Sequence, residues 1–462
     1  MKHTPPIEPP VKRGFFSHQL SPGQIFILSF AGLILAGAFL LWFPFSSSGE
    51  NLEFIDALFT ATSSVCVTGL AVLDVGKDLS FAGQVITLLL FQIGGLGIIT
   101  FSVLLFGIMG RGVSFKEREI VQTTFLHTPK RDFLVILKAV LGYTLIIESM
   151  GVLFLFIRFS QDFQPGRAFF HALYHAVSAF NNCGYSLFPD NLIGYQGDLI
   201  VNLTVMALIV LGGIGFVVLH EMVSRFRSRQ IRLSVHSRIV IYTTAILIVS
   251  GAFLFYFFER NHVIRDMPLQ SQVLVSFFQS VTPRTCGFNT VDIGNLSNAT
   301  ILVMIILMFI GASPGSTGGG IKTTSAALLL LLIWTRWKGY EEVNVFNRTI
   351  PREQLTKTFS IIFAAALSVC LITSILLLCD SGDVPAAQSR HFFVEYLFET
   401  VSAFGTVGLS MGVTPHLNDL QKLAVVIMMF AGRVGPLTLA FALALRSARK
   451  GITYAEETVM VG

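Results

Sequence analysis

The chain has 462 residues, of which 53% are hydrophobic and only 13% are charged, and its formal net charge is +5. Soluble domains carry about 25% charged residues, so this composition excludes an ordinary soluble enzyme or binding domain. Apolar runs recur along the whole length, which predicts one membrane-embedded unit rather than several soluble domains.

Eight segments are long enough to cross a bilayer core, which needs about 20 apolar residues. In chain order they are residues 22–45, 84–109, 133–157, 199–223, 238–258, 300–335, 355–379 and 421–446. Eight crossings place both termini on one side of the membrane. The tails and loops of that side carry 22 Lys and Arg residues, against eight on the other side, so the positive-inside rule predicts cytoplasmic termini. The N-terminal residues lack the pattern of a cleavable signal peptide.

Four shorter apolar stretches lie between consecutive pairs of spans, on the predicted outer side. Each has a helical part of about 11 residues, which covers about 17 Å, roughly half of a hydrocarbon core. Such helices cannot cross, so we expect them to enter the membrane and return. Each is followed by a glycine, and these glycines are Gly69, Gly184, Gly287 and Gly408.

Aligned on these glycines, the stretches are four copies of one element, called here the first to fourth copies. Ten positions before the glycines lie the aromatic residues Phe59, Tyr174, Phe277 and Phe398. Six positions before them lie Ser63, Ser178, Val281 and Ser402. A second glycine feature follows each copy after 24 to 28 residues, as IGGLG, LGGIG, IGASPGSTGGG and AGRVG. An internal repeat of this kind governs the prediction of the fold.

The predicted fold is an all-α polytopic membrane protein with eight transmembrane spans. Four repeats of span, re-entrant pore helix and span surround a pseudo-four-fold central pore. The expected divisions are a cytoplasmic N-terminal tail (1–21), pore repeat 1 (22–110), pore repeat 2 (111–224), pore repeat 3 (225–354) with an intramembrane loop (311–324), pore repeat 4 (355–446) and a cytoplasmic C-terminal tail (447–462).

The four glycine turns favour a cation pore. Non-helical backbone at membrane depth is tolerated only inside protein or beside a watery cavity. Four such segments on one axis can replace the hydration shell of an ion with backbone carbonyls, and glycine supplies the unusual backbone angles that this needs. The negative C-terminal ends of the short helices would also face the axis. The predicted selectivity filter, with the ion held by backbone carbonyls, consists of Val67, Thr68, Gly69, Asn182, Cys183, Gly184, Thr285, Cys286, Gly287, Thr406, Val407 and Gly408.

The sixth span is interrupted by the polar stretch GASPGSTGGGIKTT, from Gly311 to Thr324. A single helix over residues 300–335 would be about 54 Å long, far more than a bilayer core requires, so we expect a break at mid-depth. The break is either a static kink or a movable loop in a cavity below the filter. If Arg433 faced the helix bundle it would need a carboxylate partner, and its own span contains none. We therefore expect Arg433 near the ion path below the filter. The predicted gate consists of Gly311, Ala312, Ser313, Pro314, Gly315, Ser316, Thr317, Gly318, Gly319, Gly320, Lys322 and Arg433.

The order and spacing of six motifs resemble the membrane subunits of the Trk/Ktr/HKT superfamily of potassium transporters, and the Ktr (KtrB) type more than the Trk type. The motifs are SSVCVTGL, SAFNNCGYS, TPRTCGFNT, IGASPGSTGGGIKTT, SAFGTVGLS and AGRVGPLTLA. The resemblance runs from about residue 22 to the end of the chain. It implies potassium uptake across the bacterial inner membrane, gated by the intramembrane loop. Glycine rather than serine at position 69 favours potassium over sodium.

The resemblance also implies a homodimer in the lipid bilayer, and a cytoplasmic ring of nucleotide-binding RCK-type (KtrA-like) regulatory subunits. It implies no covalent cofactor and no nucleic-acid partner. Potassium (K+) is the expected transported ion, with sodium (Na+) considered as an activator. The sequence leaves passive flux and coupled transport open.

Two alternatives stay in view. One is a sodium-selective or poorly selective cation channel. The other is a membrane-embedded metalloenzyme that uses His171 and His175, whose spacing can bind zinc. No third ligand or activating glutamate accompanies that pair, so we favour a packing role for the two histidines.

Two cysteines and several intramembrane charges and glycines are also singled out by the sequence. We expect Cys183 and Cys286 to pack as small hydrophobic residues. Charged residues inside a membrane are costly and usually functional. The roles of Glu148, Arg284 and Glu399 stay open, with a mutual pairing of the last two behind the filter as one interpretation. The glycines of residues 94–97 and 212–215 are expected to allow close helix packing.

Overall fold

The structure is a computed structural model of the chain, and it describes residues 22–49, 51–109, 133–228, 230, 232–380 and 390–435. The expected tails, 1–21 and 447–462, lie outside the described residues. The described part is mainly helical. Its strands β1 (Asn344–Val345) and β2 (Arg348–Thr349) form one small antiparallel hairpin.

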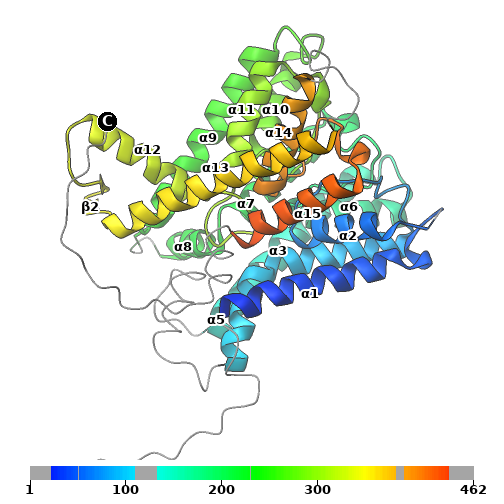
Figure 1. The fold of residues 1–462 in the computed structure, drawn as a ribbon, viewed down its shortest axis with the longest axis horizontal. Coiled ribbons are helices and arrows are strands. Elements are labelled where there is room, and N and C mark those ends of the chain that lie inside the picture. The colour runs from blue at the N-terminus through cyan, green and yellow to red at the C-terminus, as the bar shows by residue number, and fades with distance from the viewer. Residues whose placement is uncertain are drawn as a thin grey trace, which may run out of the picture.

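In the structure, each copy is part of a larger repeat, and from this point a copy means that whole repeat. It consists of a long helix, a short helix and one or two further helices (Figure 1). The first copy contains α1 (Pro22–Trp42), α2 (Phe54–Val65) and α3 (Phe81–Met109). The second contains α5 (Phe133–Phe159), α6 (Pro165–Phe180), α7 (Leu199–Gly213) and α8 (Phe216–Arg227). The third contains α9 (Val235–Glu259), α10 (Leu269–Val281), α11 (Asn298–Phe309) and α12 (Thr323–Trp337). The fourth contains α13 (Arg352–Asp380), α14 (Arg390–Gly405) and α15 (Asp419–Val434).

The short helices are somewhat longer than the sequence suggests. α2, α6, α10 and α14 have 12, 16, 13 and 16 residues. Even 16 residues cover only about 24 Å, less than a bilayer core of about 30 Å. Short 3-10 helices lie on the return path after the second, third and fourth of them, at Ile193–Tyr195, Ile293–Asn295 and Thr414–His416.

The chain is an integral membrane protein by the length and composition of its helices. Within the described ranges, α5, α9 and α13 are long and apolar enough to cross a membrane, and the bent pair α7 and α8 would make a fourth span. Shorter apolar stretches occur in α1, α3 and α11. The outer face of α13 carries exposed apolar side chains such as Phe363 and Leu378. The expected eight spans exceed what these helices establish, so that number stays a prediction.

The second copy is sharply bent within the predicted span over residues 199–223. The chain bends by 105° between α7 and α8, where Gly215 has a φ of +97°. The Phe216 N–H donates to the Gly315 carbonyl at 2.9 Å, so the bend packs against the loop of residues 311–324. The glycines of residues 212–215 therefore do more than allow close packing, because Gly215 ends one helix before the next begins.

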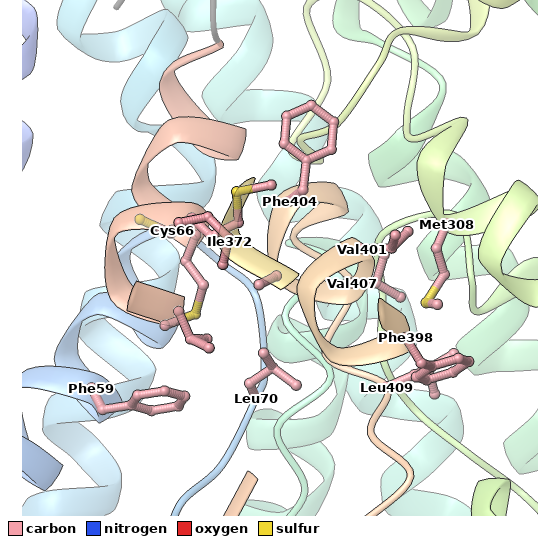
Figure 2. Packing of buried hydrophobic residues seen from close by; sticks show 14 of the residues in the cluster. Phe59, Cys66, Leu70, Met308, Ile372, Phe398, Val401, Phe404, Val407 and Leu409 are labelled. Atoms are coloured by element: carbon pink, nitrogen blue, oxygen red, sulfur yellow. The ribbon is translucent and has the colours of Figure 1, made fainter. Parts of the chain in front are cut away.

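The C-terminal parts of the four short helices are buried, and their side chains contribute to three of the buried hydrophobic clusters. The largest buried cluster joins α1 and α2 with α11, α13, α14 and α15. Figure 2 shows its members Phe59, Leu70, Phe398 and Leu409, which come from equivalent positions of the first and fourth copies. In these two copies, the aromatic position that recurs in the sequence is thus a core position.

Candidate functional site

The four repeat glycines form a closed ring of contacts. At each of them, a side chain would point at the carbonyl oxygen of the residue that precedes the glycine of the next copy. The distances from a Cβ atom built on the glycine to that oxygen are 1.9 Å from Gly69 to Cys183, 2.0 Å from Gly184 to Cys286, 2.3 Å from Gly287 to Val407 and 2.2 Å from Gly408 to Thr68. The fourth copy thereby meets the first, and the second and fourth copies lie opposite each other. No residue with a Cβ atom fits any of these positions without moving backbone.

The backbone of the four segments has an alternating conformation. All four ring glycines have φ values between +79° and +91°, in the left-handed region that favours glycine. Two positions earlier, each copy has a non-glycine residue with positive φ, and these residues are Val67, Asn182, Thr285 and Thr406. Such strained residues cluster at functional sites. Alternating signs of φ can turn successive carbonyl groups toward the same side of the chain, as a carbonyl-lined ion site requires.

A hydroxyl group near the end of each short helix holds the segment that follows it. The Ser63 hydroxyl donates to the Leu70 carbonyl at 2.8 Å and accepts from the Gly69 N–H at 3.0 Å. The Ser178 hydroxyl donates to the carbonyl of Tyr185 at 2.9 Å. In the fourth copy, the Gly408 N–H donates to the Ser402 hydroxyl at 3.1 Å.

In the third copy this role falls to Thr282, whose hydroxyl donates to the Phe288 carbonyl at 2.5 Å. Thr282 lies five positions before Gly287. The sequence alignment on the glycines instead assigns this role to Val281, six positions before Gly287. The aromatic position shifts in the same direction, because Phe278 is fully buried while Phe277 is 38% exposed. Alignment on the glycines is therefore wrong by one residue for the helix of the third copy.

The shift has a backbone cause. In the first copy, the Thr68 N–H bonds to the carbonyl of Ser63, five residues earlier, at 2.7 Å. In the third copy, the Cys286 N–H bonds to the carbonyl of Thr282, only four residues earlier, at 3.0 Å. One residue fewer thus separates the third helix from its glycine.

The glycine-rich loop of residues 311–324 lies where the short helices end and the glycine segments begin. The Gly319 N–H donates to the Thr406 hydroxyl at 3.0 Å. A Cβ atom built on Gly318 would lie 2.1 Å from the Thr285 hydroxyl oxygen. The Thr317 hydroxyl donates to the carbonyl of Phe180, the last residue of α6, at 3.2 Å. The loop thus touches the first residues of the third and fourth glycine segments and the C-terminal end of α6.

The loop is also bound to the second copy and to itself. Its Ser313 and Thr317 N–H groups donate to the carbonyls of Gly213 and Gly212 at 3.0 and 3.2 Å. The Lys322 ammonium donates to the carbonyl of Gly318 at 2.8 Å. Most of the expected gate residues on the loop are buried, namely Gly311, Ala312, Ser313, Ser316, Thr317, Gly318 and Gly319, while Pro314, Gly315, Gly320 and Lys322 are half-buried.

Arg433 joins this loop to the first copy. Its guanidinium, which is only 3% exposed, donates to the carbonyl of Thr317 and to those of Gly94 and Gly95, the last two at 2.6 and 3.2 Å. Backbone carbonyls therefore take the place of a carboxylate partner. Through Arg433 the loop contacts elements of all four copies.

The other intramembrane charges have separate partners. Arg284 donates to the Thr244 hydroxyl at 3.2 Å, while Glu399 accepts from the Thr414 hydroxyl. These contacts replace the interpretation in which Arg284 and Glu399 pair with each other. Glu148 accepts from the side-chain amides of Gln92 and Asn181, at 3.3 and 3.2 Å.

The two histidines of α6 are engaged in packing and hydrogen bonds. His175 Nδ1 lies 2.7 Å from the carbonyl of His171 and its Nε2 lies 2.9 Å from the Ser186 hydroxyl. Both rings stack on Phe188. In the part of the chain that the structure describes, no group of three or more His, Cys, Asp or Glu residues is arranged to hold a metal ion.

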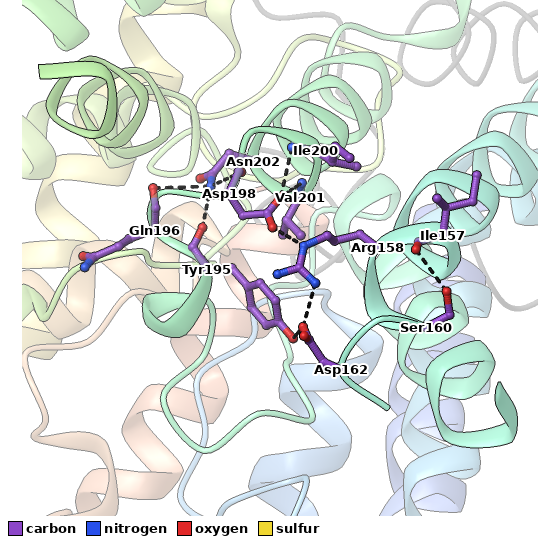
Figure 3. Close-up of polar contacts among 10 residues, drawn as sticks. All are labelled: Ile157, Arg158, Ser160, Asp162, Tyr195, Gln196, Asp198, Ile200, Val201 and Asn202. Atoms are coloured by element: carbon purple, nitrogen blue, oxygen red, sulfur yellow. Dashed lines mark hydrogen bonds and ion pairs between the residues drawn. The ribbon is translucent and has the colours of Figure 1, made fainter. Parts of the chain in front are cut away.

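A polar network joins the C-terminal end of α5 to the N-terminal end of α7 (Figure 3). Arg158, in the last turn of α5, pairs with Asp198 and, at 2.8 Å, with Asp162. Asp198 also caps α7, because its Oδ1 accepts from two backbone N–H groups at 3.0 Å. The Tyr195 hydroxyl donates to Asp162 at 2.9 Å. Burial and this carboxylate raise the pKa of Tyr195, so the phenol remains a neutral donor.

Comparisons with known proteins bear on the family and on the overall fold. A family described as "TrkH: Cation transport protein" matches residues 21–450. The chain is 36% identical over 442 residues to the "Ktr system potassium uptake protein B" of Vibrio alginolyticus, covering 95% of this chain and 94% of that protein. It is 36% identical over 449 residues to the "Potassium/sodium uptake protein NtpJ" of Enterococcus hirae, covering 96% and 98%. The fold is similar to the crystal structure of the potassium transporter TrkH from Vibrio parahaemolyticus, with a TM-score of 0.72 and 19% identity over 94% of this chain and 87% of that chain.

Proposed function

The chain belongs to the TrkH family of cation transport proteins, and from that membership we propose that it takes up potassium ions across the bacterial inner membrane. Several relatives that match nearly the whole chain are named as potassium uptake proteins. The family is one of transporters, so the membrane-embedded metalloenzyme is set aside.

The observation that carries the proposal is the closed glycine ring. Four backbone carbonyls, those of Thr68, Cys183, Cys286 and Val407, lie at the contacts between neighbouring copies. A ring of carbonyl oxygens can replace the hydration shell of a potassium ion. The C-terminal ends of the four short helices add negative dipole charge around the same axis. The segments 67–69, 182–184, 285–287 and 406–408 are thus the proposed selectivity filter.

The loop of residues 311–324 is the proposed gate. It packs against one filter segment at Thr285, donates a hydrogen bond to another at Thr406, and is held by Arg433 at Thr317. A buried loop at this place obstructs an ion that leaves the filter, and two cations, Lys322 and Arg433, add an electrostatic barrier. Movement of the helices on either side of the loop, α11 and α12, would open the path.

Partners follow from the same family membership. Several relatives are named as members of a Ktr system, a name that implies association with other subunits. The proposed assembly is a homodimer with a cytoplasmic ring of RCK-type nucleotide-binding subunits, which would move the gate. Passive flux is the simplest mode, because about 2.3 kcal/mol per charge is available for each 100 mV of membrane potential.

The test is potassium-dependent growth of an uptake-deficient bacterium that expresses the chain, with and without sodium. Rescue at low potassium supports the proposal, and a rise in uptake on adding sodium would make sodium an activator. The Enterococcus relative is named for both ions, so sodium transport is the second candidate. Sodium uptake without potassium rescue would favour that candidate and overturn the first.

A further inference from the structure

A second buried polar layer lies one helical turn before the serine and threonine hydroxyls that hold the filter segments. Its members occupy the same structural position once the helix of the third copy is shifted by one residue, and they are Thr60, His175, Gln279 and Glu399. Each of these side chains is at most 1% exposed. Polar groups buried to this degree normally need hydrogen-bond partners. In three of the four copies the partner lies on the chain just beyond the filter glycine.

The second and third copies make this contact directly. The carbonyl of His171 can only accept, so His175 Nδ1 carries the proton in that 2.7 Å contact. In the neutral ring, Nε2 then accepts from the Ser186 hydroxyl at 2.9 Å. In the third copy, the Gln279 amide donates to the Thr290 hydroxyl at 3.3 Å. Ser186 and Thr290 follow their filter glycines by two and three residues.

The fourth copy makes the contact through two hydroxyls. Glu399 accepts from the Thr414 hydroxyl, which lies 3.0 Å from the hydroxyl of Ser410. Ser410 follows the filter glycine by two residues, as Ser186 does in the second copy. The other carboxylate oxygen of Glu399 is buried and has no hydrogen-bond partner among the described residues.

The first copy is held in another way. The Thr60 hydroxyl is buried and has no hydrogen-bond partner in the described part of the chain. Instead, the Tyr185 hydroxyl of the second copy donates to the Leu70 carbonyl at 3.0 Å. Each of the four segments that follow the ring glycines is therefore held by a buried polar side chain. Thr60 is the position of the layer that holds no segment.

We propose that His175, Gln279 and Glu399 are positioning residues, which hold the outer ends of three filter segments and thereby help to determine which cations pass. This inference rests on the proposed function of the glycine ring. The carbonyls that bind an ion belong to segments of three residues, so a small displacement of one end changes the cage. The hydroxyls of Ser63, Ser178, Thr282 and Ser402 hold these segments from the helix side, and the second layer holds them from beyond the glycine.

The experiment measures the ratio of potassium to sodium flux in liposomes that contain the full-length chain. Glu399→Leu replaces the acceptor with an apolar side chain of similar volume. Its partner Thr414 keeps a contact with Ser410, so no donor is stranded. We expect the flux ratio to fall on the order of fivefold, the effect of losing one hydrogen bond. Glu399→Gln retains an acceptor oxygen, and the third copy already has Gln at this position, so this variant should keep the wild-type ratio.

Thr60→Val is the matched control, because it changes the same layer where no tie exists. It should leave the flux ratio unchanged. Thr414→Val removes the same contact from the other side, and it should reproduce the defect of Glu399→Leu without adding to it in the double variant. That variant also tests the proposal if Glu399→Leu is not recovered as folded protein.

The outcomes separate the inference from the proposed function. A wild-type protein that carries no cation flux at all would remove the function on which the inference depends. A selective wild type together with unchanged ratios in Glu399→Leu and Thr414→Val would overturn the positioning role alone. An equal loss of selectivity in Thr60→Val would do the same, since it would mean that any change in this layer disturbs the filter.

Discussion

The guanidinium of Arg433 donates a hydrogen bond to the backbone carbonyl of Thr317, although 116 residues separate them in the chain. The contact joins the fourth copy to the centre of the buried loop. Because the same guanidinium binds the carbonyls of Gly94 and Gly95, it also fixes the loop to α3 of the first copy. Loss of this side chain should therefore free the loop more than it disturbs the helices.

Replacement of this arginine should raise the ion flux. Arg433→Ala removes charge-assisted hydrogen bonds that hold the loop in the path, and each is worth about 1.5 kcal/mol or more. We expect flux to rise by up to about tenfold, the factor that corresponds to about 1.4 kcal/mol. Potassium uptake by liposomes at matched protein content measures this change. Arg433→Lys keeps the charge but not the forked geometry, and it should give an intermediate flux. A folded Arg433→Ala protein with wild-type flux would count against the gate.

Shortening the loop should have a larger effect. Deletion of Ser313 to Thr317 removes the groups that bind Gly212, Gly213 and Phe180. The expected result is faster potassium uptake that depends less on the cytoplasmic regulatory partner. Uptake is compared with the wild type in cells, with and without that partner. If the deletion variant folds and dimerises but keeps slow, fully regulated uptake, the loop does not act as the gate.

The first filter glycine should not tolerate serine. In Gly69→Ser, the new Cβ atom would lie 1.9 Å from the Cys183 carbonyl oxygen, at a φ of +89°. The carbonyl must move, so we expect the preference for potassium over sodium to fail before flux does. Gly412→Ala is the control, because Gly412 has a similar φ of +95° but no neighbour within 4 Å. Unchanged affinity and selectivity in Gly69→Ser would remove residues 67–69 from the filter.

The two cysteines of the filter should be replaceable. Cys183 and Cys286 are fully buried in hydrophobic clusters, and it is their backbone carbonyls that meet the neighbouring glycines. Cys183→Ala and Cys286→Ala should therefore keep potassium uptake and selectivity, at a modest cost in stability from the lost packing. Flux ratios in liposomes test this. Altered selectivity in either variant would mean that a sulfur atom shapes the filter directly.

The polar network between α5 and α7 should matter for stability rather than transport. Asp198→Ala removes the cap of α7 and the partner of Arg158, so the free energy of unfolding should fall by about 1–2 kcal/mol. Thermal unfolding of the purified protein in detergent measures the loss. Asp162→Ala breaks a half-exposed ion pair, worth about 0–1 kcal/mol, and the hydrogen bond from Tyr195, but it leaves the cap of α7 intact and serves as the comparison. Equal midpoints for the two variants would show that the cap contributes little.

Some of the architecture could be read from residues alone. Apolar runs, short helices and the four glycines are local features, since they follow from hydropathy and from the backbone freedom of single residues. The positive φ of Gly69, Gly184, Gly287 and Gly408 agrees with the turns that their spacing predicts. The break of the sixth span at Gly311 to Thr324 was likewise visible, because proline, glycine and hydroxyl residues interrupt an apolar run.

Tertiary structure alone decided the remaining relationships. The one-residue shift of the third copy depends on whether Cys286 bonds four or five residues back, and hydropathy carries no trace of that choice. The bend at Gly215 depends on the loop chain that packs against it. The partners of Arg433 and Glu399 were equally hidden, because a buried polar group takes whichever donor or acceptor the folded chain brings within reach, and those groups lie far away in the sequence or are backbone atoms common to every residue.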